Sequence, residues 1–215
     1  MDYAITDAGP IYDDLTFRHT TAMLDEDLMV FIDQVQARTV HTLDIAYHRK
    51  GTWARNLTGG TGWTPSQRDG YSYLRDAQIV RADTGVALGV CNKPYWSPST
   101  IFLARGNMTE TITATGVGAH EEDRVPMVIF RRQSRDTAFG WGVSVSGKVV
   151  TMQPLNVVNA AGQAVSPSTA SAFWVTVENS PNRALVTNPD RLPLTVSLTD
   201  GSLWTTQRVF DVGDF

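Results

Sequence analysis

Hydrophobic and polar positions alternate along most of the chain, and the clearest case is the stretch Leu15–Val35. Two apolar runs, 15–24 and 28–35, are joined by the acidic step Asp25-Glu26-Asp27. Val, Ile, Phe and Thr dominate both runs, and a connector of about three residues suits a β-hairpin. The alternation then continues over residues 35–48, which predicts a third strand.

The rest of the chain predicts more strands and no helix, since no stretch shows a period of 3.6. Ser146-Gly147 predicts a tight turn, and Asp200-Gly201 predicts a hairpin. About a dozen strands imply two packed sheets, because a single open sheet of that width would curl or split. We therefore predict an all-β, two-sheet antiparallel β-sandwich formed by one domain over residues 1–215, with residues 1–14 as an N-terminal loop or edge segment. Further strand candidates are residues 71–81, 86–90, 101–105, 108–118, 126–134, 138–147, 148–158, 173–179, 183–188, 194–198 and 202–210.

Composition and charge exclude several classes of partner. The net charge of −4 argues against a nucleic-acid partner, which needs clustered Lys and Arg. No run approaches the ~20 apolar residues of a membrane helix. The single cysteine, Cys91, allows no intrachain disulfide and is expected to be a small buried hydrophobe. Low charge with abundant Thr, Ser and Gly is typical of a secreted or periplasmic bacterial protein. The start lacks a leader pattern, so we expect an excised fragment of a longer chain.

Two segments rich in aromatic residues are the best candidates for binding. One is a loop over residues 49–70, and the other is residues 93–98. Exposed Trp and Tyr rings can stack on the C–H faces of sugars, and Arg binds a carboxylate through a two-pronged fork. Together they predict a platform for an acidic polysaccharide; the alternative is that the rings plug the ends of the sandwich. The candidate ligand-binding residues are Trp53, Arg55, Trp63, Arg68, Lys93, Tyr95 and Trp96.

Tyr47 and His48 are the only candidates for catalysis. Both residue types can act as a base at an acidic carbon. Strand alternation would put Tyr47 on one face and Asp44 with His48 on the other. The alternative interpretation is a His at a strand end, packed under a loop.

Other polar clusters are assigned structural roles. The Arg131-Arg132 pair, with Arg135, predicts a solvated strand end, with the two neighbours facing opposite ways. The segment 120–123 is expected to be an acidic turn and not a metal site, because consecutive residues rarely converge on one ion. We predict no cofactor and no metal. Trp141, Trp174 and Trp204 fall within strand patterns and are expected in the core or at its rim.

The order of these features resembles the C-terminal β-sandwich region of heparinase II/III-like polysaccharide lyases. The similar elements are Arg18, the acidic turn 25–27, the segment Ile32-Asp33-Gln34-Val35 and the strand His41–His48. The segments 102–118 and 125–145 are similar to later strands of that region. The resemblance lies in strand order and spacing over residues 15–150.

This resemblance implies an α/α toroid followed by β-sandwich domains, with an active site between them that cleaves uronate-containing glycans by β-elimination. The toroid would supply a Tyr and an Asn or His, and early sandwich strands a His and metal ligands, including a His-Asn strand. The present sequence contains neither a toroid nor a His-Asn pair. The resemblance therefore implies that a catalytic domain lies upstream in the same chain.

Three hypotheses follow from the sequence. The first is a non-catalytic module of a polysaccharide lyase that binds acidic, uronate-containing polysaccharide such as alginate. The second is a lyase fragment that retains β-elimination activity through Tyr47 and His48. The third is a structural domain that supports a catalytic toroid and binds no ligand.

Overall fold

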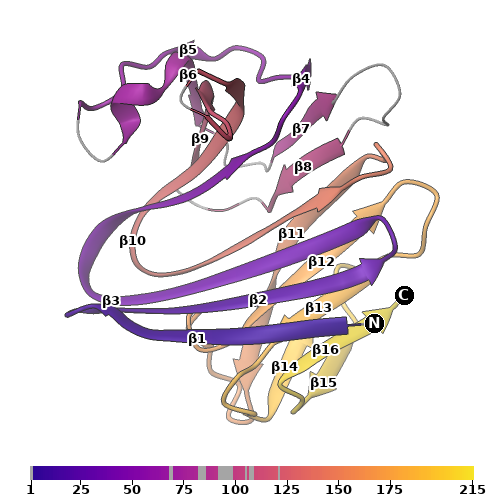
Figure 1. The fold of residues 1–215 in the computed structure, drawn as a ribbon. Helices are drawn as coiled ribbons and strands as arrows, with labels where there is room; N and C mark the ends of the chain where they lie inside the picture. The colour runs from indigo at the N-terminus through magenta and orange to yellow at the C-terminus, as the bar shows by residue number, and fades with distance from the viewer. Residues whose placement is uncertain are drawn as a thin grey trace.

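The fold consists of two antiparallel β-sheets (Figure 1). The computed structural model describes residues 2–67, 70–81, 86–91, 99–104, 106, 109–120 and 122–215. Within these residues the only helical segment is a single 3₁₀ turn, η1, over Tyr71–Tyr73. The predicted all-β, two-sheet architecture is confirmed.

The first sheet contains ten strands. Its main path runs β1-β2-β3-β10-β8-β7-β4, and a branch from β10 continues through β9 and β6 to β5. The strands are β1 (Asp2–Tyr12), β2 (Leu15–Asp25), β3 (Leu28–His48), β4 (Thr52–Arg55), β5 (Thr61–Gly62), β6 (Arg75–Arg81), β7 (Val86–Cys91), β8 (Ser99–Leu103), β9 (Thr109–Val117) and β10 (Arg124–Ser144).

The second sheet contains six strands in the order β15-β14-β11-β12-β13-β16. Its hairpin between β14 and β15 turns at Gly201, whose φ of 86° is a conformation that glycine adopts readily. The strands are β11 (Val150–Asn159), β12 (Ser171–Val177), β13 (Arg183–Thr187), β14 (Leu194–Ser197), β15 (Leu203–Thr206) and β16 (Phe210–Asp214).

The predicted hairpin at the start of the chain is confirmed as β2 and β3, with Thr20 opposite Ile32. The sequence was wrong to divide residues 28–48 and 126–147 into separate strands. β3 and β10 are each one strand of 21 residues. They pair in two stretches, residues 28–36 with 136–144 and residues 41–48 with 127–134. The ladder shifts register between Ser134 and Asp136 of β10. Such an irregularity bends a strand without ending it, so both strands continue through the bend seen in Figure 1.

The bend divides the first sheet into two parts. We call the far halves of β3 and β10, together with β4, β5, β6 and β9, the wing (Figure 1). The near halves of β3 and β10 lie beside β1 and β2. One face of this near part packs on the second sheet through a core that includes Ile32, Phe102 and Phe173. The other face belongs to a core that continues along the inside of the bend, through Trp141, Phe139 and Phe130.

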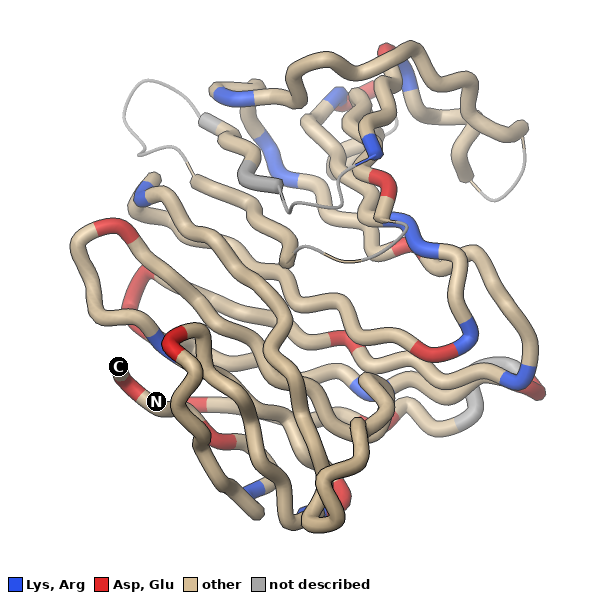
Figure 2. The backbone as a smooth tube through the Cα atoms, turned by 180° about the vertical axis from the view of Figure 1, so that it is seen from behind, with Lys and Arg blue, Asp and Glu red and all other residues tan. Residues whose placement is uncertain are grey.

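Charge is distributed unevenly between the two parts. Lys and Arg outnumber Asp and Glu in residues 44–81, and they remain in slight excess when residues 109–132 are added; the two ranges form most of the wing. Acidic residues are in excess in the remainder, and Figure 2 shows both signs along the backbone. No helix in the described part of the chain is long and apolar enough to span a membrane.

Candidate functional site

A row of aromatic rings covers the inner face of the bend. We call Phe17, His19, Phe31, Trp141 and Tyr47 the aromatic floor. The ring centroids of successive members are 6.3, 5.7, 4.3 and 5.9 Å apart. Three strands supply the rings, because alternate residues of β2, β3 and β10 face the same side of the sheet. The floor is therefore a continuous apolar surface of stacked and edge-on rings.

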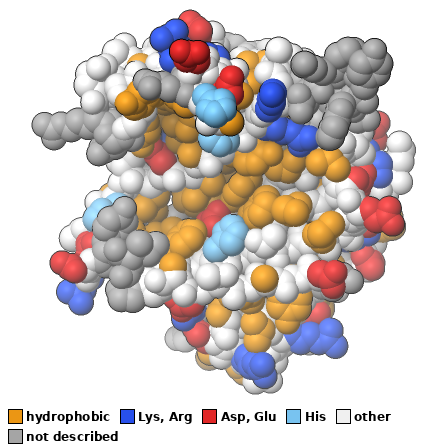
Figure 3. Space-filling model, viewed as in Figure 1, with side chains coloured by type: hydrophobic (Ala, Val, Ile, Leu, Met, Phe, Trp, Pro, Cys, Tyr) orange, Lys and Arg blue, Asp and Glu red, His pale blue; other side chains and the backbone are white. Residues whose placement is uncertain are grey.

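The floor is open to a ligand. Phe17, Phe31 and Tyr47 are half-buried, and 32% of the His19 side chain is exposed. Figure 3 shows this side of the molecule hollowed between the wing and the near sheet, with hydrophobic side chains and a histidine on the surface of the hollow. Trp141 is 7% exposed, so a ligand would meet the four partly exposed rings around it. Partly exposed aromatic rings on a concave surface can stack on sugars.

A buried carboxylate organises the middle of the floor. Asp33 lies opposite His19 in the β2–β3 ladder and is 2% exposed. Its Oδ1 accepts a hydrogen bond from Nδ1 of His19 at 2.5 Å, and its Oδ2 accepts one from the Trp141 indole at 2.6 Å. Nε2 of His19 lies 2.8 Å from the Thr21 hydroxyl. Both rings are thereby held in a fixed orientation.

The same carboxylate changes the acid–base properties of the imidazole. Its hydrogen bond with Asp33 raises the pKa of His19, and partial burial opposes the shift only in part. A protonated imidazole donates from both ring nitrogens. Nε2 is the ring nitrogen that Asp33 does not occupy, so a ligand that exchanged a proton or a hydrogen bond with His19 would do so there, in place of the Thr21 hydroxyl.

The structure separates the two residues predicted to be catalytic. Tyr47 belongs to the floor, where its ring contacts Trp141 edge-on. His48 is exposed on the opposite face of β3, where Asp44 also lies. The alternation predicted for this strand is present, and because of it Tyr47 and His48 do not point into one site.

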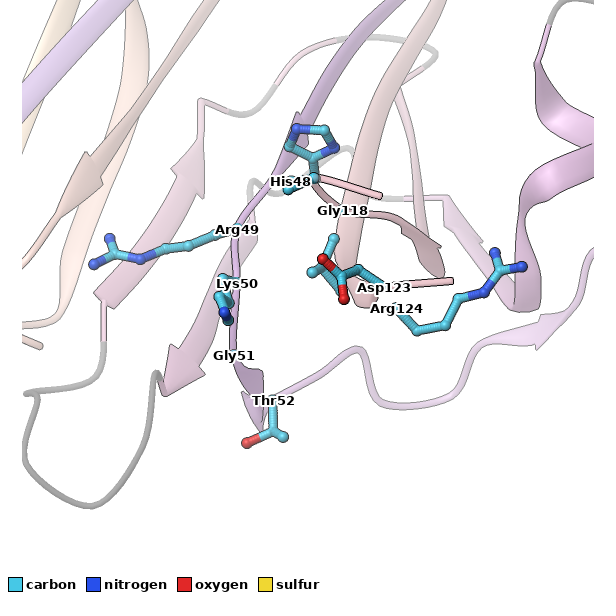
Figure 4. Close-up of a pocket in the computed structure, with 10 residues that line it drawn as sticks. His48, Arg49, Lys50, Gly51, Thr52, Gly118, Asp123 and Arg124 are labelled. Carbon is cyan, nitrogen blue, oxygen red and sulfur yellow. The ribbon is translucent and has the colours of Figure 1, made fainter. Parts of the chain in front are cut away.

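His48 borders a basic pocket of about 550 Å³ on the wing (Figure 4). Residues 48–52 form one wall, and 118–119 with 123–125 form the other. Figure 4 shows Arg49 and Arg124 extending in opposite directions, away from the centre of the pocket. The Arg124 guanidinium donates to the Tyr73 carbonyl at 2.9 Å. The pocket therefore brings positive charge to one edge of the wing without converging it on one point.

The candidate binding residues divide between three places. Trp53 is half-buried and packs against the same core as Tyr47, while Arg55 is exposed beside it on β4. Trp63 lies under the Arg131 guanidinium at 5.2 Å, so its face is already occupied. The remaining candidates, Arg68, Lys93, Tyr95 and Trp96, lie outside the described residues, and so does the side chain of Cys91.

The expectation that Arg131 and Arg132 form a solvated strand end is wrong. β10 does not end there, and the two side chains leave opposite faces of a strand that runs on through the bend. Arg131 forms a two-pronged ion pair with Asp44, with both N–O distances 2.8 Å, and each side chain is 15% exposed. Tyr71 donates a third hydrogen bond to this carboxylate. Arg132 is buried and is discussed below.

No metal centre forms among the described residues: no three His, Cys, Asp or Glu side chains converge. In the segment predicted as an acidic turn, His120 and Asp123 are exposed. The Asp123 amide donates to the His120 carbonyl at 3.0 Å, which closes the turn.

Sequence reasoning missed His19, Asp33 and Phe17 as site residues. A signal was present, because a hairpin centred on Glu26 places His19 opposite Asp33. These two polar residues interrupt the apolar alternation on the same face of adjacent strands. Their pairing with Trp141, 108 residues later in the chain, carried no local signal.

Comparison with known proteins indicates a distant likeness in fold. No protein-family model matches the chain, and no curated protein matches it significantly. Two solved structures of a heparinase III, one with methylated lysines, match 86% of this chain at 13% identity, with TM-scores of 0.51 and 0.50. The chain spans a quarter of the length of that heparinase III. At this identity the match concerns the fold alone: the chain has the fold of a heparinase III fragment.

Proposed function

We propose that this chain is a non-catalytic carbohydrate-binding or accessory module of a polysaccharide lyase, and that it binds acidic, uronate-containing polysaccharide along the aromatic floor. The observation that carries the proposal is the row of rings from Phe17 to Tyr47 in the hollow of the bend. A row of rings can follow successive sugar units of a chain, with the partly exposed rings of Phe17, Phe31 and Tyr47 as the apolar contacts.

The charge of the wing supports an acidic ligand. Lys50 and Arg55 are exposed close to where β3 passes into β4, beyond Tyr47, and Arg49 lies with them. Cations that follow the last ring of the floor along the chain can pair with uronate carboxylates while the rings hold the sugar faces. The likeness in fold to a heparinase III fragment agrees with a polysaccharide ligand. The proposal places the chain in a secreted or periplasmic bacterial protein with an upstream catalytic domain.

The proposal is tested by affinity electrophoresis and calorimetry with alginate, heparin, hyaluronan and pectate against neutral glycans. We expect retardation by at least one acidic glycan and a salt-sensitive affinity. Phe17→Ala and Tyr47→Ala should each weaken binding by roughly three- to ten-fold, because each removes one stacking face. Tyr73→Ala is the matched control, since Tyr73 is an exposed aromatic residue outside the floor. No binding to any glycan, or an equal loss in the control, would contradict the proposal.

One observation favours a second function, β-elimination by this chain. Asp33 orients the His19 imidazole as a base or acid, and Tyr47 lies in the same floor. In this second hypothesis His19 takes the catalytic role that the sequence analysis assigned to His48. Elimination creates an unsaturated uronate that absorbs ultraviolet light, so absorbance is followed on the same glycan mixtures. A rise that His19→Gln abolishes and His48→Gln leaves intact would establish the activity.

A further inference from the structure

Arg132 is a buried arginine at the bend of β10, 6% exposed. Its Nε donates to Thr109 Oγ1 at 2.8 Å, and its Nη1 donates to Thr137 Oγ1 at 3.1 Å and to the Ala138 carbonyl at 2.7 Å. The guanidinium lies over the Phe139 ring, 4.4 Å from its centroid. Four residues thus fix the position of this cation, and all four are neutral.

No carboxylate among the described residues lies within 4.0 Å of this guanidinium. Its neighbour Arg131 is less buried and has Asp44 as a close counter-ion. Burial lowers the pKa of Arg132 to about 10. Charged groups that are buried this deeply are almost always paired, because the low-dielectric surroundings leave the charge without compensation. A buried arginine without a counter-ion therefore requires an explanation.

The guanidinium borders a cavity of about 500 Å³ between the bend and the second sheet. Gly106, Arg132, Thr137 and Ala138 line one side, and residues of β11 and the segment 164–173 line the other. Nη2 makes no hydrogen bond to a described residue, yet it is not sealed from solvent. A Cβ on Gly106 would lie 2.3 Å from Nη2, so glycine leaves room for this amino group at the cavity wall.

From these observations we propose that the cavity beside Arg132 is a binding site for a small organic carboxylate. One carboxylate oxygen accepts from Nη2, and the Thr137 hydroxyl donates to the second oxygen. Thr137 Oγ1 accepts from Arg132, and its own hydrogen has no acceptor among the described residues. The ligand thereby supplies a counter-ion and a hydrogen-bond acceptor to a guanidinium that the protein has already buried and oriented.

The lining defines the rest of the ligand. Apolar side chains dominate the walls, among them Leu155, Val157, Val165 and Phe173, and the volume falls within the range for small-molecule sites. Arg132 is the only charged side chain in the lining, with Thr137 beside it, and the opposite wall carries the neutral polar side chains of Asn156, Ser171 and Ser197. This arrangement suits a carboxylate attached to a compact apolar or sugar body. A highly charged nucleotide or a polymer does not match it. None of the five floor residues lines this cavity, so the inference stands apart from the polysaccharide surface.

The inference is tested with sodium glucuronate as the probe, sodium benzoate as a carboxylate with an apolar body, and methyl glucoside and sodium sulfate as comparison compounds. Binding is measured by calorimetry and by the shift of the Arg132 Nε–H signal in NMR spectra. We expect one or both carboxylates to bind at one site and to shift this signal, with methyl glucoside inert. Sulfate binding as tightly as both carboxylates would overturn the assignment of ligand class.

Three variants separate binding from folding. Arg132→Met keeps the length of the side chain and removes the charge, and it should weaken carboxylate binding by at least ten-fold. Thr137→Val keeps the cation and should weaken binding by about three- to ten-fold, and it remains informative if Arg132→Met does not fold. Arg135→Met, an exposed arginine on the same strand, is the matched control and should bind as the parent does.

Unchanged affinity in folded Arg132→Met or in Thr137→Val would overturn the site, and so would absence of a shift at Arg132 with all compounds. Phe17→Ala should leave carboxylate binding intact. Failure of this inference and failure of the polysaccharide proposal are therefore distinguishable, because the two depend on different variants and different ligands.

Discussion

His19 and Asp33 face one another across β2 and β3, and their side chains meet at 2.5 Å between Nδ1 and Oδ1. The carboxylate also accepts from the indole of Trp141 on β10, so three adjacent strands share one buried acceptor. This relationship links the hairpin predicted from local sequence to a strand more than a hundred residues away. It also fixes two of the five rings of the aromatic floor.

The first prediction concerns the pKa of His19. Asp33→Asn should lower the pKa of the imidazole, because the charge that favours its protonated form is removed. The pKa is read from the pH dependence of the His19 ring signals in NMR spectra. Thr21→Val is the control: it removes the hydroxyl at Nε2 but keeps the carboxylate, so it should leave most of the shift. An unchanged pKa in Asp33→Asn would contradict the assigned cause.

The second prediction concerns stability and pH. The pKa of His19 is higher in the folded state than in the unfolded state. The His19–Asp33 pair therefore stabilises the fold fully at a pH below the pKa of the unfolded state, and this stabilisation is lost as the pH rises through the pKa of the folded state. His19→Gln should therefore lower the free energy of unfolding more at about pH 5 than at about pH 9. Urea unfolding at the two pH values measures the difference. The opposite order would show that the folded state disfavours the protonated imidazole.

The third prediction concerns the ion pair on the wing. Asp44→Asn should destabilise the fold by roughly 1–3 kcal/mol, because it leaves the mostly buried Arg131 guanidinium without its counter-ion. Urea unfolding, followed by Trp fluorescence, measures this change. Lys148→Gln is the control: Lys148 pairs with Asp27 at 3.6 Å and is 42% exposed, and surface pairs of that kind contribute little. Equal effects in the two variants would refute a structural role for the Asp44 pair.

The fold was largely predictable because hydrophobic and polar residues alternate locally along most of its strands. Period-two patterning, the acidic turn after Leu24 and the glycine turn at Gly201 are each local signals, and the hairpins they predict are present. The continuity of β3 and β10 through the bend was not predictable in the same way. Polar residues around Arg135 look like a loop in the sequence. In the structure residue 135 and residues 37–40 fall at the register shift, where the ladder is interrupted but both strands continue.

The candidate site was less predictable, because it depends on tertiary contacts. Tyr47 and Trp53 were identified from residue type alone, and the structure places both on the core inside the bend. Trp63 has the same residue type, but it packs under Arg131. No local pattern distinguishes these cases. Arg132 shows the same limit, since the hydroxyl that accepts from its Nε belongs to Thr109 on β9, 23 residues earlier in the chain.

The fourth prediction concerns the contact between the two sheets. At Gly140 of β10, an added Cβ would lie 2.5 Å from Phe173 Cε1 and 2.8 Å from Met152 Cε, both from the second sheet. These side chains belong to the core between the sheets and have little room to move, so Gly140→Ala should destabilise the fold by about 1–3 kcal/mol. Gly62→Ala is the matched control in a strand, because nothing lies within 4 Å of its added Cβ. Urea unfolding compares them, and a neutral Gly140→Ala would mean that the sheets pack less closely than the structure shows.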